Sequence, residues 1–286
     1  MKIAFLGTGL MGEPMAQRLL SAGYKLNVFN RTTLKTEKLC KNGAVLAFKP
    51  IDAINDSEIV ITMLSDYSAI CEVLCSSKKI SFKDKTVIQM STISPGENLL
   101  LKERVESSGG EYLEAPVLGS IPQATDGSLI ILVGSTEEQF QKHKKLFETM
   151  GSKIILLGEV GSGSAVKLAL NQMIASLMSS FSMSIGYLRE MNADVDKFME
   201  ILRGSALYAP TFDRKLPNLL NRDFSQTNFP LKHLLKDINL IINQFAQNNI
   251  DTTMLDAVKN ILNKSISQKL AEQDYTAFYN VIHPLK

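Results

Sequence analysis

Residues 1–160 alternate between short apolar runs and longer amphipathic stretches. The apolar runs are rich in β-branched residues and are bounded by turn residues, which is typical of buried strands. In chain order they read IAFLG, LNVFN, IVITML, TVIQMS, YLEAPV, LIILVG and KIILLG. The stretches between them have helical periodicity, and several end in a glycine that can cap a helix. Strands that alternate with helices predict parallel pairing, and hence a doubly wound α/β sheet.

The pattern changes after the segment LLGEVGSGS, because only helix-period segments follow it. No flexible linker separates the two halves, so the connection itself is expected to be helical. We therefore predict an α/β domain over residues 1–162 and an all-α domain over residues 163–286, entered through a long interdomain helix. The helices expected there are Ser164 to about Met191, Asp194–Leu202, Leu231–Asn248, Thr252–Ser267 and Tyr275–Ile282.

The composition is that of an ordinary globular protein, with 45% hydrophobic and 21% charged residues in a chain of 286. The formal net charge is only +2 and no basic or acidic block occurs, which argues against nucleic acid or an anionic membrane as a partner. The segment Leu168–Leu188 is uncharged and long enough to span a bilayer, which takes about 20 residues. It contains Asn171, Gln172 and several serines, however, so we expect the buried helix of a soluble protein.

Cysteine and histidine are sparse. The three cysteines, Cys40, Cys71 and Cys75, cannot all pair and lie in helical patterns, which favours a reduced, cytoplasmic compartment. Cys71 and Cys75 share a helix face, but no further ligand close in sequence completes a metal-binding set. The sequence therefore predicts no metal site.

A glycine-rich turn follows the first predicted strand and opens the first predicted helix. It reads Gly7-Thr8-Gly9-Leu10-Met11-Gly12. Gly7 permits a tight turn, Gly9 lets the backbone approach a pyrophosphate, and Gly12 lets helix and strand pack closely. The N–H groups at the helix start would face the anion. A purely structural turn is the alternative, but the position within a strand–helix–strand unit favours a Rossmann-type domain that binds a dinucleotide through this turn.

The segment FNRTTLK, residues 29–35, ends the second predicted strand, where a carboxylate would bind the ribose of NAD. No carboxylate is present at Asn30 or near it. Arg31 offers charge-assisted donors for a 2′-phosphate, Thr32 offers a hydroxyl and Lys35 a second positive charge. The alternative is that Thr32 or Thr33 caps the next helix and that Arg31 is solvated, and both interpretations can hold together. The segment favours NADP(H) as the cofactor.

Three further segments stand where predicted strands end, the edge at which open α/β sheets bind ligands. We expect the first of them to contact the cofactor. They are Met63-Leu64-Ser65, Ser91–Pro95 and Glu114–Ser120.

Five motifs occur in order over nearly the whole chain. They read GTGLMGEPMAQRLLSAG, STISPG, EAPVLGS with DGSLIILVG, GEVGSGSAVKLALNQM and FPLKHLLKDINL. Together they resemble the β-hydroxyacid dehydrogenase family, which includes 3-hydroxyisobutyrate dehydrogenase and tartronate semialdehyde reductase. Within it they are most similar to the glyoxylate/succinic semialdehyde reductase branch. Ordered motifs at compatible spacing are far more specific than any one of them.

The resemblance implies that Lys167 is the catalytic residue, because it occupies the lysine of the family's G-x-G-x-x-x-K-x-x-x-N motif. The spacing also makes chemical sense, since Lys167 and Asn171 are four residues apart and so share a helix face. Hydride delivery to a carbonyl carbon builds negative charge on the oxygen, and an ammonium can stabilise that charge and donate the proton. Asn171 can orient the lysine or bind the substrate.

The resemblance also implies that Ser91 and Thr92 contact cofactor and substrate. It places Lys236 at the nicotinamide end of the cofactor and Asp237 near the substrate. The alternative for Lys236 is an ordinary ion pair on a helix surface.

One position departs from the family pattern. The family commonly has serine in its APVSG motif, where a hydroxyl and backbone N–H groups hold the substrate carboxylate, and this chain has Leu118 there. The backbone donors of Gly119 and Ser120 remain, and the Ser120 hydroxyl could substitute. A hydrogen bond to a charged group is worth about 1.5–3 kcal/mol, so either carboxylate binding weakens roughly tenfold or more, or the substrate is a more apolar one.

The sequence thus predicts an NADPH-dependent reductase of small aldehyde or keto acids, such as glyoxylate or succinic semialdehyde. Alternatives are a 3-hydroxyisobutyrate dehydrogenase or 2-hydroxy-3-oxopropionate reductase, an imine reductase, and a non-catalytic NADPH-binding protein. Retention of Lys167 and Asn171 argues against the imine reductase, and the non-catalytic protein is disfavoured because all the family's reactive positions but one are filled. The long apolar helix invites burial by more than its own domain, and the family resemblance implies a homodimer or homotetramer.

Overall fold

The computed structural model describes residues 1–77 and 79–285. These residues form two compact units that divide between Leu168 and Ala169, inside helix α8 (Ser162–Glu190). Each unit has its own topology and core.

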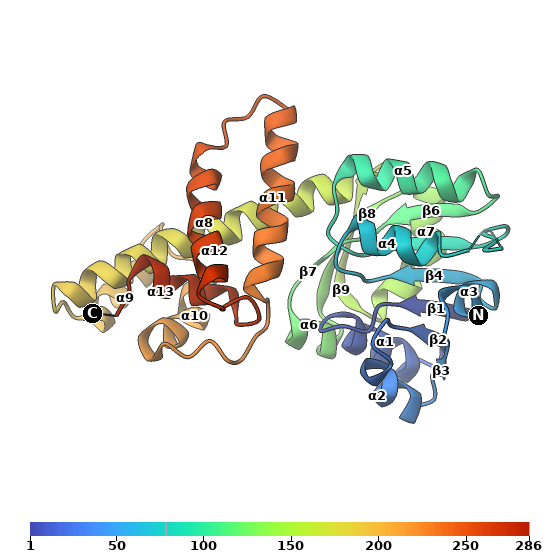
Figure 1. Ribbon diagram of the computed structural model, residues 1–286, viewed down its shortest axis with the longest axis horizontal. Helices are drawn as coiled ribbons and strands as arrows, with labels where there is room; N and C mark the ends of the chain where they lie inside the picture. Colours follow the sequence, from blue (N-terminus) through green and yellow to red (C-terminus); the bar gives the residue numbers. More distant parts are fainter. Residues whose placement is uncertain (78, 286) are drawn as a thin grey trace. The chain divides into compact units, whose positions relative to one another are not determined.

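The first unit is built on one sheet with the strand order β3-β2-β1-β4-β5-β6-β8-β7, and β9 pairs with β8 (Figure 1). Pairing is parallel from β3 through to β6, which confirms the doubly wound sheet. The strands are β1 (Lys2–Leu6), β2 (Lys25–Phe29), β3 (Val45–Leu46), β4 (Ile59–Thr62), β5 (Thr86–Gln89), β6 (Glu111–Glu114), β7 (Val117–Leu118), β8 (Leu129–Gly134) and β9 (Gly151–Gly158).

Both faces of this sheet are covered by helices, and strand β1 shows why. Ile3 and Phe5 belong to one apolar cluster, packed against α1 and α7, whereas Ala4 and Leu6 belong to another, packed against α3, α4 and α5. A strand buried on both faces needs apolar residues at consecutive positions, and KIAFL supplies them. The helical segments of the unit are α1 (Gly12–Ser21), η1 (Thr33–Thr36), α2 (Glu37–Lys41), α3 (Pro50–Asn55), α4 (Tyr67–Leu74), α5 (Pro95–Glu106), α6 (Ile121–Asp126) and α7 (Glu137–Glu148).

Strand β8 departs from the predicted parallel pairing, because it runs antiparallel to both β6 and β7. A parallel crossover needs a connection long enough to return along the sheet. Between β7 and β8 the chain offers only α6, a helix of 6 residues, so the chain turns back instead. The short strands β3 and β7 were also not predicted, since two residues give no periodicity.

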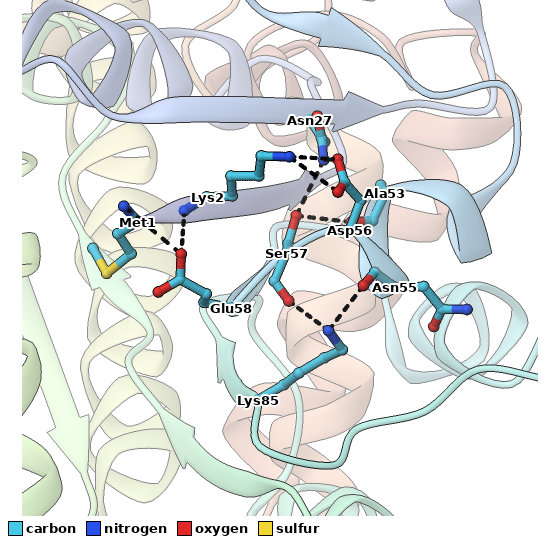
Figure 2. A network of polar contacts seen from close by, with 9 residues as sticks. All are labelled: Met1, Lys2, Asn27, Ala53, Asn55, Asp56, Ser57, Glu58 and Lys85. Carbon is cyan, nitrogen blue, oxygen red and sulfur yellow. Dashed lines mark hydrogen bonds and ion pairs between the residues drawn. The ribbon is translucent and has the colours of Figure 1, made fainter.

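A polar network braces the edge of the sheet at which β1, β4 and β5 begin (Figure 2). Asp56 accepts hydrogen bonds from Lys2 Nζ at 3.0 Å and from Asn27 Nδ2 at 3.1 Å. The hydrogen bond from Lys2, followed by that from Asn27, lowers the pKa of the Asp56 carboxyl. Lys85 Nζ donates to the Ser57 carbonyl oxygen at 2.6 Å. This edge is opposite to the strand ends that carry the glycine-rich turn.

The second unit is helical, as predicted; within the described residues its one β feature is an isolated bridge between Pro230 and Asp274. Helix α10 was not predicted, because Pro217 lies inside it and proline normally interrupts a helix, whereas Pro210 stands at its first position, where proline is tolerated. None of the helices in residues 1–77 and 79–285 is long and apolar enough to cross a membrane. Besides the main part of α8, the unit contains α9 (Val195–Arg203), α10 (Pro210–Asn221), α11 (Leu231–Gln247), α12 (Thr253–Ser267), η2 (Tyr275–Phe278) and α13 (Tyr279–Ile282).

Candidate active site

The glycine-rich turn joins β1 to α1, and its glycines differ in what their neighbours allow. Gly7 has a φ of +103°, and a Cβ there would overlap the Met63 carbonyl oxygen. A Cβ on Gly12 would overlap the Gly7 carbonyl oxygen. Gly9 is different, because a Cβ there would meet no atom within 4 Å. Gly7 and Gly12 are therefore required by the fold, whereas Gly9 leaves open space beside the start of α1, which suits an anionic group.

Asn30, at the end of β2, ties this turn to the next segment. Its Oδ1 accepts from the Thr8 backbone N–H at 3.1 Å, and its Nδ2 donates to the Thr32 carbonyl oxygen at 2.9 Å. Arg31, Thr32 and Lys35 are all exposed. Thr32 precedes η1 but makes no side-chain capping hydrogen bond. Nothing in residues 1–77 and 79–285 forms a hydrogen bond or ion pair with the Arg31 side chain, so its guanidinium is accessible.

Ser91 lies after β5 and is buried. Its hydroxyl oxygen accepts from the Leu64 backbone N–H at 2.8 Å, and its own backbone N–H donates to Gln89 Oε1. Ser91 therefore holds the segment Met63–Ser65 in place. Within that segment Ser65 is exposed and Met63 is half-buried, as is Thr92 beside Ser91.

The segment that follows β6 presents Leu118, Gly119 and Ser120. Leu118 lies in β7 and pairs with Ile130, and Gly119 is exposed with a φ of +139°. Ser120 donates both its hydroxyl and its backbone N–H to Gln123 Oε1, at 2.9 Å and 3.0 Å. Gln123 was not singled out from the sequence, although glutamine three residues after serine at a helix start is a capping signal. Both polar hydrogens of Ser120 are thus already engaged.

Lys167 and Asn171 both lie in α8 and are buried, with exposed fractions of 7% and 2%. Asn171 Nδ2 donates to Asp237 Oδ2 at 2.7 Å, and Lys236 Nζ lies 2.7 Å from Asp237 Oδ1. Because Asp237 can only accept when ionised, it fixes the Asn171 amide with its oxygen turned away. That oxygen is buried without a hydrogen-bond partner among the described residues, so it can accept a further hydrogen bond.

In the part of the chain that the structure describes, no group of three His, Cys, Asp or Glu residues could hold a metal ion. The residues present do fit a dinucleotide: open space at Gly9 beside the start of α1, and an accessible guanidinium at Arg31. The fold and this turn define a dinucleotide-binding α/β domain joined to a helical domain.

Comparison with known proteins identifies the family. Residues 2–158 match the model of the NAD-binding domain of 6-phosphogluconate dehydrogenase, and residues 161–282 match that of the NAD-binding domain of NADP-dependent 3-hydroxyisobutyrate dehydrogenase. The chain is 33% identical to glyoxylate/succinic semialdehyde reductase 2, chloroplastic, of Arabidopsis thaliana, covering 99% of this chain and 79% of that protein. It is 31% identical to glyoxylate/succinic semialdehyde reductase 1 of the same plant, covering 99% and 98%.

Among solved structures, 3-hydroxyisobutyrate dehydrogenase of Mycobacterium tuberculosis superposes with a TM-score of 0.89 at 23% identity, covering 98% of each chain. The chain belongs to the β-hydroxyacid dehydrogenase family and is an NAD(P)-dependent hydroxyacid dehydrogenase.

Proposed function

We propose that this enzyme is an NADPH-dependent reductase of small aldehyde or keto acids, with glyoxylate and succinic semialdehyde as its substrates. The observation that carries the proposal is the pair Lys167 and Asn171, which are both buried on one face of α8. The chain that bears them aligns over 99% of its length with two glyoxylate/succinic semialdehyde reductases. Lys167 is the proton donor and Asn171 the acceptor that orients the substrate.

The chemistry balances with these residues. A nicotinamide cofactor, when held by the glycine-rich turn and Arg31, would supply a hydride for the carbonyl carbon of the substrate. Lys167 stabilises the charge that develops on the carbonyl oxygen and transfers its proton to that oxygen, which yields the hydroxy acid. Asn171 Oδ1, left unpartnered by the hydrogen bond between Nδ2 and Asp237, accepts from the Lys167 ammonium or from the new hydroxyl. Asp237 thereby fixes which end of the Asn171 amide, Nδ2 or Oδ1, remains available.

We propose NADPH rather than NADH on the chemistry at the end of β2. Arg31 is accessible, and Asn30, which stands where a ribose-binding carboxylate would be expected, is engaged by Thr8 and Thr32. Thr32 and Lys35 add a hydroxyl and a charge beside the 2′-phosphate. Lys236 is assigned to the nicotinamide end.

On the substrate side, Thr92 and the Gly119 N–H are the donors proposed for the carboxylate. The Ser120 donors are engaged by Gln123, and Leu118 has none to offer. Ser91 contributes by holding the neighbouring segment, through its bond to Leu64.

The experiment that tests this proposal is a panel of glyoxylate, succinic semialdehyde, tartronate semialdehyde and 3-hydroxyisobutyrate, each assayed with both nicotinamide cofactors. The proposal predicts turnover of the first two with NADPH. A preference for 3-hydroxyisobutyrate with NAD would instead support the alternative function, that of a 3-hydroxyisobutyrate dehydrogenase.

We also propose a cytoplasmic location, domains that divide at residues 162 and 163, and a homodimer or homotetramer. Three apolar side chains near the end of α8 are each more than half exposed and stand four residues apart: Met183, Tyr187 and Met191. Such an apolar stripe suits burial against a second copy. Sedimentation analysis of the wild type and of Tyr187→Glu tests the assembly.

A further inference from the structure

Glu114 is a fully buried carboxylate at the end of β6. Its Oε1 accepts three backbone hydrogen bonds, from Gly161 at 2.7 Å, Gly163 at 2.8 Å and Ser164 at 3.2 Å. These N–H groups stand at the start of α8, where a helix leaves its first donors without intrahelical partners. One oxygen atom therefore satisfies most of the amino end of this helix.

Two glycines make room for this carboxylate. A Cβ on Gly134, at the end of β8, would overlap Glu114 Oε1. A Cβ on Gly163 would lie 2.5 Å from the Leu132 carbonyl oxygen and 3.2 Å from Glu114 Oε1. Neither glycine has a positive φ, so their small size, and not their backbone freedom, is what the position requires. The carboxylate sits in a cradle built from β8 and the first turn of α8.

We infer that Glu114 is a positioning residue for catalysis: it fixes the first turn of α8 and thereby sets where Lys167 lies. Lys167 follows Ser164, whose N–H is bound by Glu114, by only three residues of continuous helix. A rigid turn transmits the position of its start to a side chain one turn later. This inference rests on the function proposed above.

Glu114 has a second connection to the site. It immediately precedes the segment Ala115–Ser120, whose Gly119 N–H is proposed to hold the substrate carboxylate. One side chain thus joins the segment proposed for substrate binding to the helix that bears the proposed acid. Charge-assisted hydrogen bonds to backbone N–H groups are about twice as strong as neutral ones, so they can keep the start of α8 at a fixed distance from this segment.

The electrostatics of Glu114 indicate that its burial costs stability. Burial raises the pKa of the Glu114 carboxyl, and the hydrogen bonds from Ser164, Gly161 and Gly163 act against that rise. The second oxygen, Oε2, is buried without a hydrogen-bond partner among the described residues. A buried carboxyl with an unmet oxygen costs stability, so a role in packing alone would be served better by an apolar residue.

The test compares Glu114→Met, which keeps the volume but removes the acceptor, with Glu114→Gln, which keeps an acceptor oxygen. The matched control is Glu111→Gln, on the same strand, whose side chain is about half exposed and pairs with Lys142 at 2.8 Å. Two quantities are measured: amide hydrogen exchange over residues 158–168, and kcat for glyoxylate with its solvent isotope effect.

We expect Glu114→Met to accelerate exchange at residues 161–164 and to lower kcat by up to about 10²-fold, as a shift of the reacting groups by roughly 1 Å can do. Its solvent isotope effect should rise, because proton donation becomes slower, while the NADPH Kd stays unchanged. Glu114→Gln should retain most of kcat, and Glu111→Gln all of it.

The inference is overturned if Glu114→Met exchanges at the wild-type rate, or if its kcat falls only in proportion to the folded fraction, with an unchanged isotope effect. The proposed function fails separately, if the wild type turns over none of the carbonyl acids. The exchange measurement needs no turnover and decides the positioning of α8 in that case as well.

Discussion

Two side chains, Arg31 and Leu118, carry the specificity that we propose: the first for the cofactor and the second for the acid. Arg31 is accessible and lies beside a turn already ordered by Asn30. The family resemblance implies that a hydroxyl at the position of Leu118 would reach the substrate carboxylate. At this scale the enzyme is defined by which polar atoms are engaged within the protein and which are left for a ligand.

Arg31→Ala is expected to raise the KM for NADPH by roughly tenfold to a hundredfold, since it removes hydrogen bonds from a charged donor to a phosphate, worth about 1.5–3 kcal/mol. The KM for NADH should change little. Lys41→Ala, an exposed lysine at the end of α2, is the control. Equal losses with both cofactors would assign Arg31 to general binding and not to selection.

Leu118→Ser is expected to lower the KM for glyoxylate by roughly tenfold, because it adds a donor to the carboxylate. Leu118→Ala separates that donor from the loss of bulk and should not reproduce the gain. Gln123→Ala should also lower the KM, since it releases both donors of Ser120. Steady-state kinetics on the three variants check this, and an equal gain in Leu118→Ala would contradict it.

In the turn between β1 and α1, different glycines are expected to serve folding and cofactor binding. Gly12→Ala should lower the melting temperature, because the new Cβ overlaps the Gly7 carbonyl oxygen. Gly9→Ala has open space and should melt like the wild type, yet its methyl group would stand where the pyrophosphate approaches. Calorimetry and a fluorescence titration with NADPH measure the two effects. Unimpaired NADPH binding in Gly9→Ala would remove the turn from the cofactor site.

Helix α7 contributes an acid-sensitive element through His143, which is buried and whose Nε2 has no hydrogen-bond partner in the described residues. Burial, with a contribution from the Lys142 charge, lowers the pKa of His143 to about 4 from 6.5. Between pH 6.5 and 4 the imidazole of His143 is protonated in the unfolded chain but not in the folded chain. The free energy of unfolding therefore keeps its whole contribution from His143 above pH 6.5 and loses it as the pH drops towards 4.

His143→Leu should remove this dependence, so that its free energy of unfolding declines less than that of the wild type between pH 6.5 and 4. Urea denaturation at several pH values measures the difference. Parallel curves for the two proteins would show that His143 is not the group responsible.

The elements themselves were predicted where a periodic signal is long. Helix α8 was expected from Ser164 and begins at Ser162, and α11 was expected to end at Asn248 and ends at Gln247. The antiparallel direction of β8 was missed because direction depends on the length of α6, which periodicity does not report. Helix α10 was missed because tertiary packing overrides the local preference of Pro217.

For the molecule as a whole, local motifs single out the parts of the proposed site that lie close in sequence, such as the turn Gly7–Gly12 and the pair Lys167 and Asn171. The roles of Glu114 and Gln123 were not predicted. The bonds of Glu114 reach residues about 50 positions away, and nothing in one sequence reports such a contact. Asp237 was expected near the substrate, but its hydrogen bond with Asn171, from another helix, was not predicted.

The central claim about the reaction is the proposed assignment of Lys167 as the proton donor. Its most direct test measures NADPH binding and glyoxylate reduction for Lys167→Ala side by side. We predict that NADPH binds with the wild-type Kd while kcat falls by about 10²–10⁴-fold, the usual contribution of a general acid, and that an added primary amine restores part of the rate. Reduction of glyoxylate by Lys167→Ala at nearly the wild-type rate would contradict the assignment.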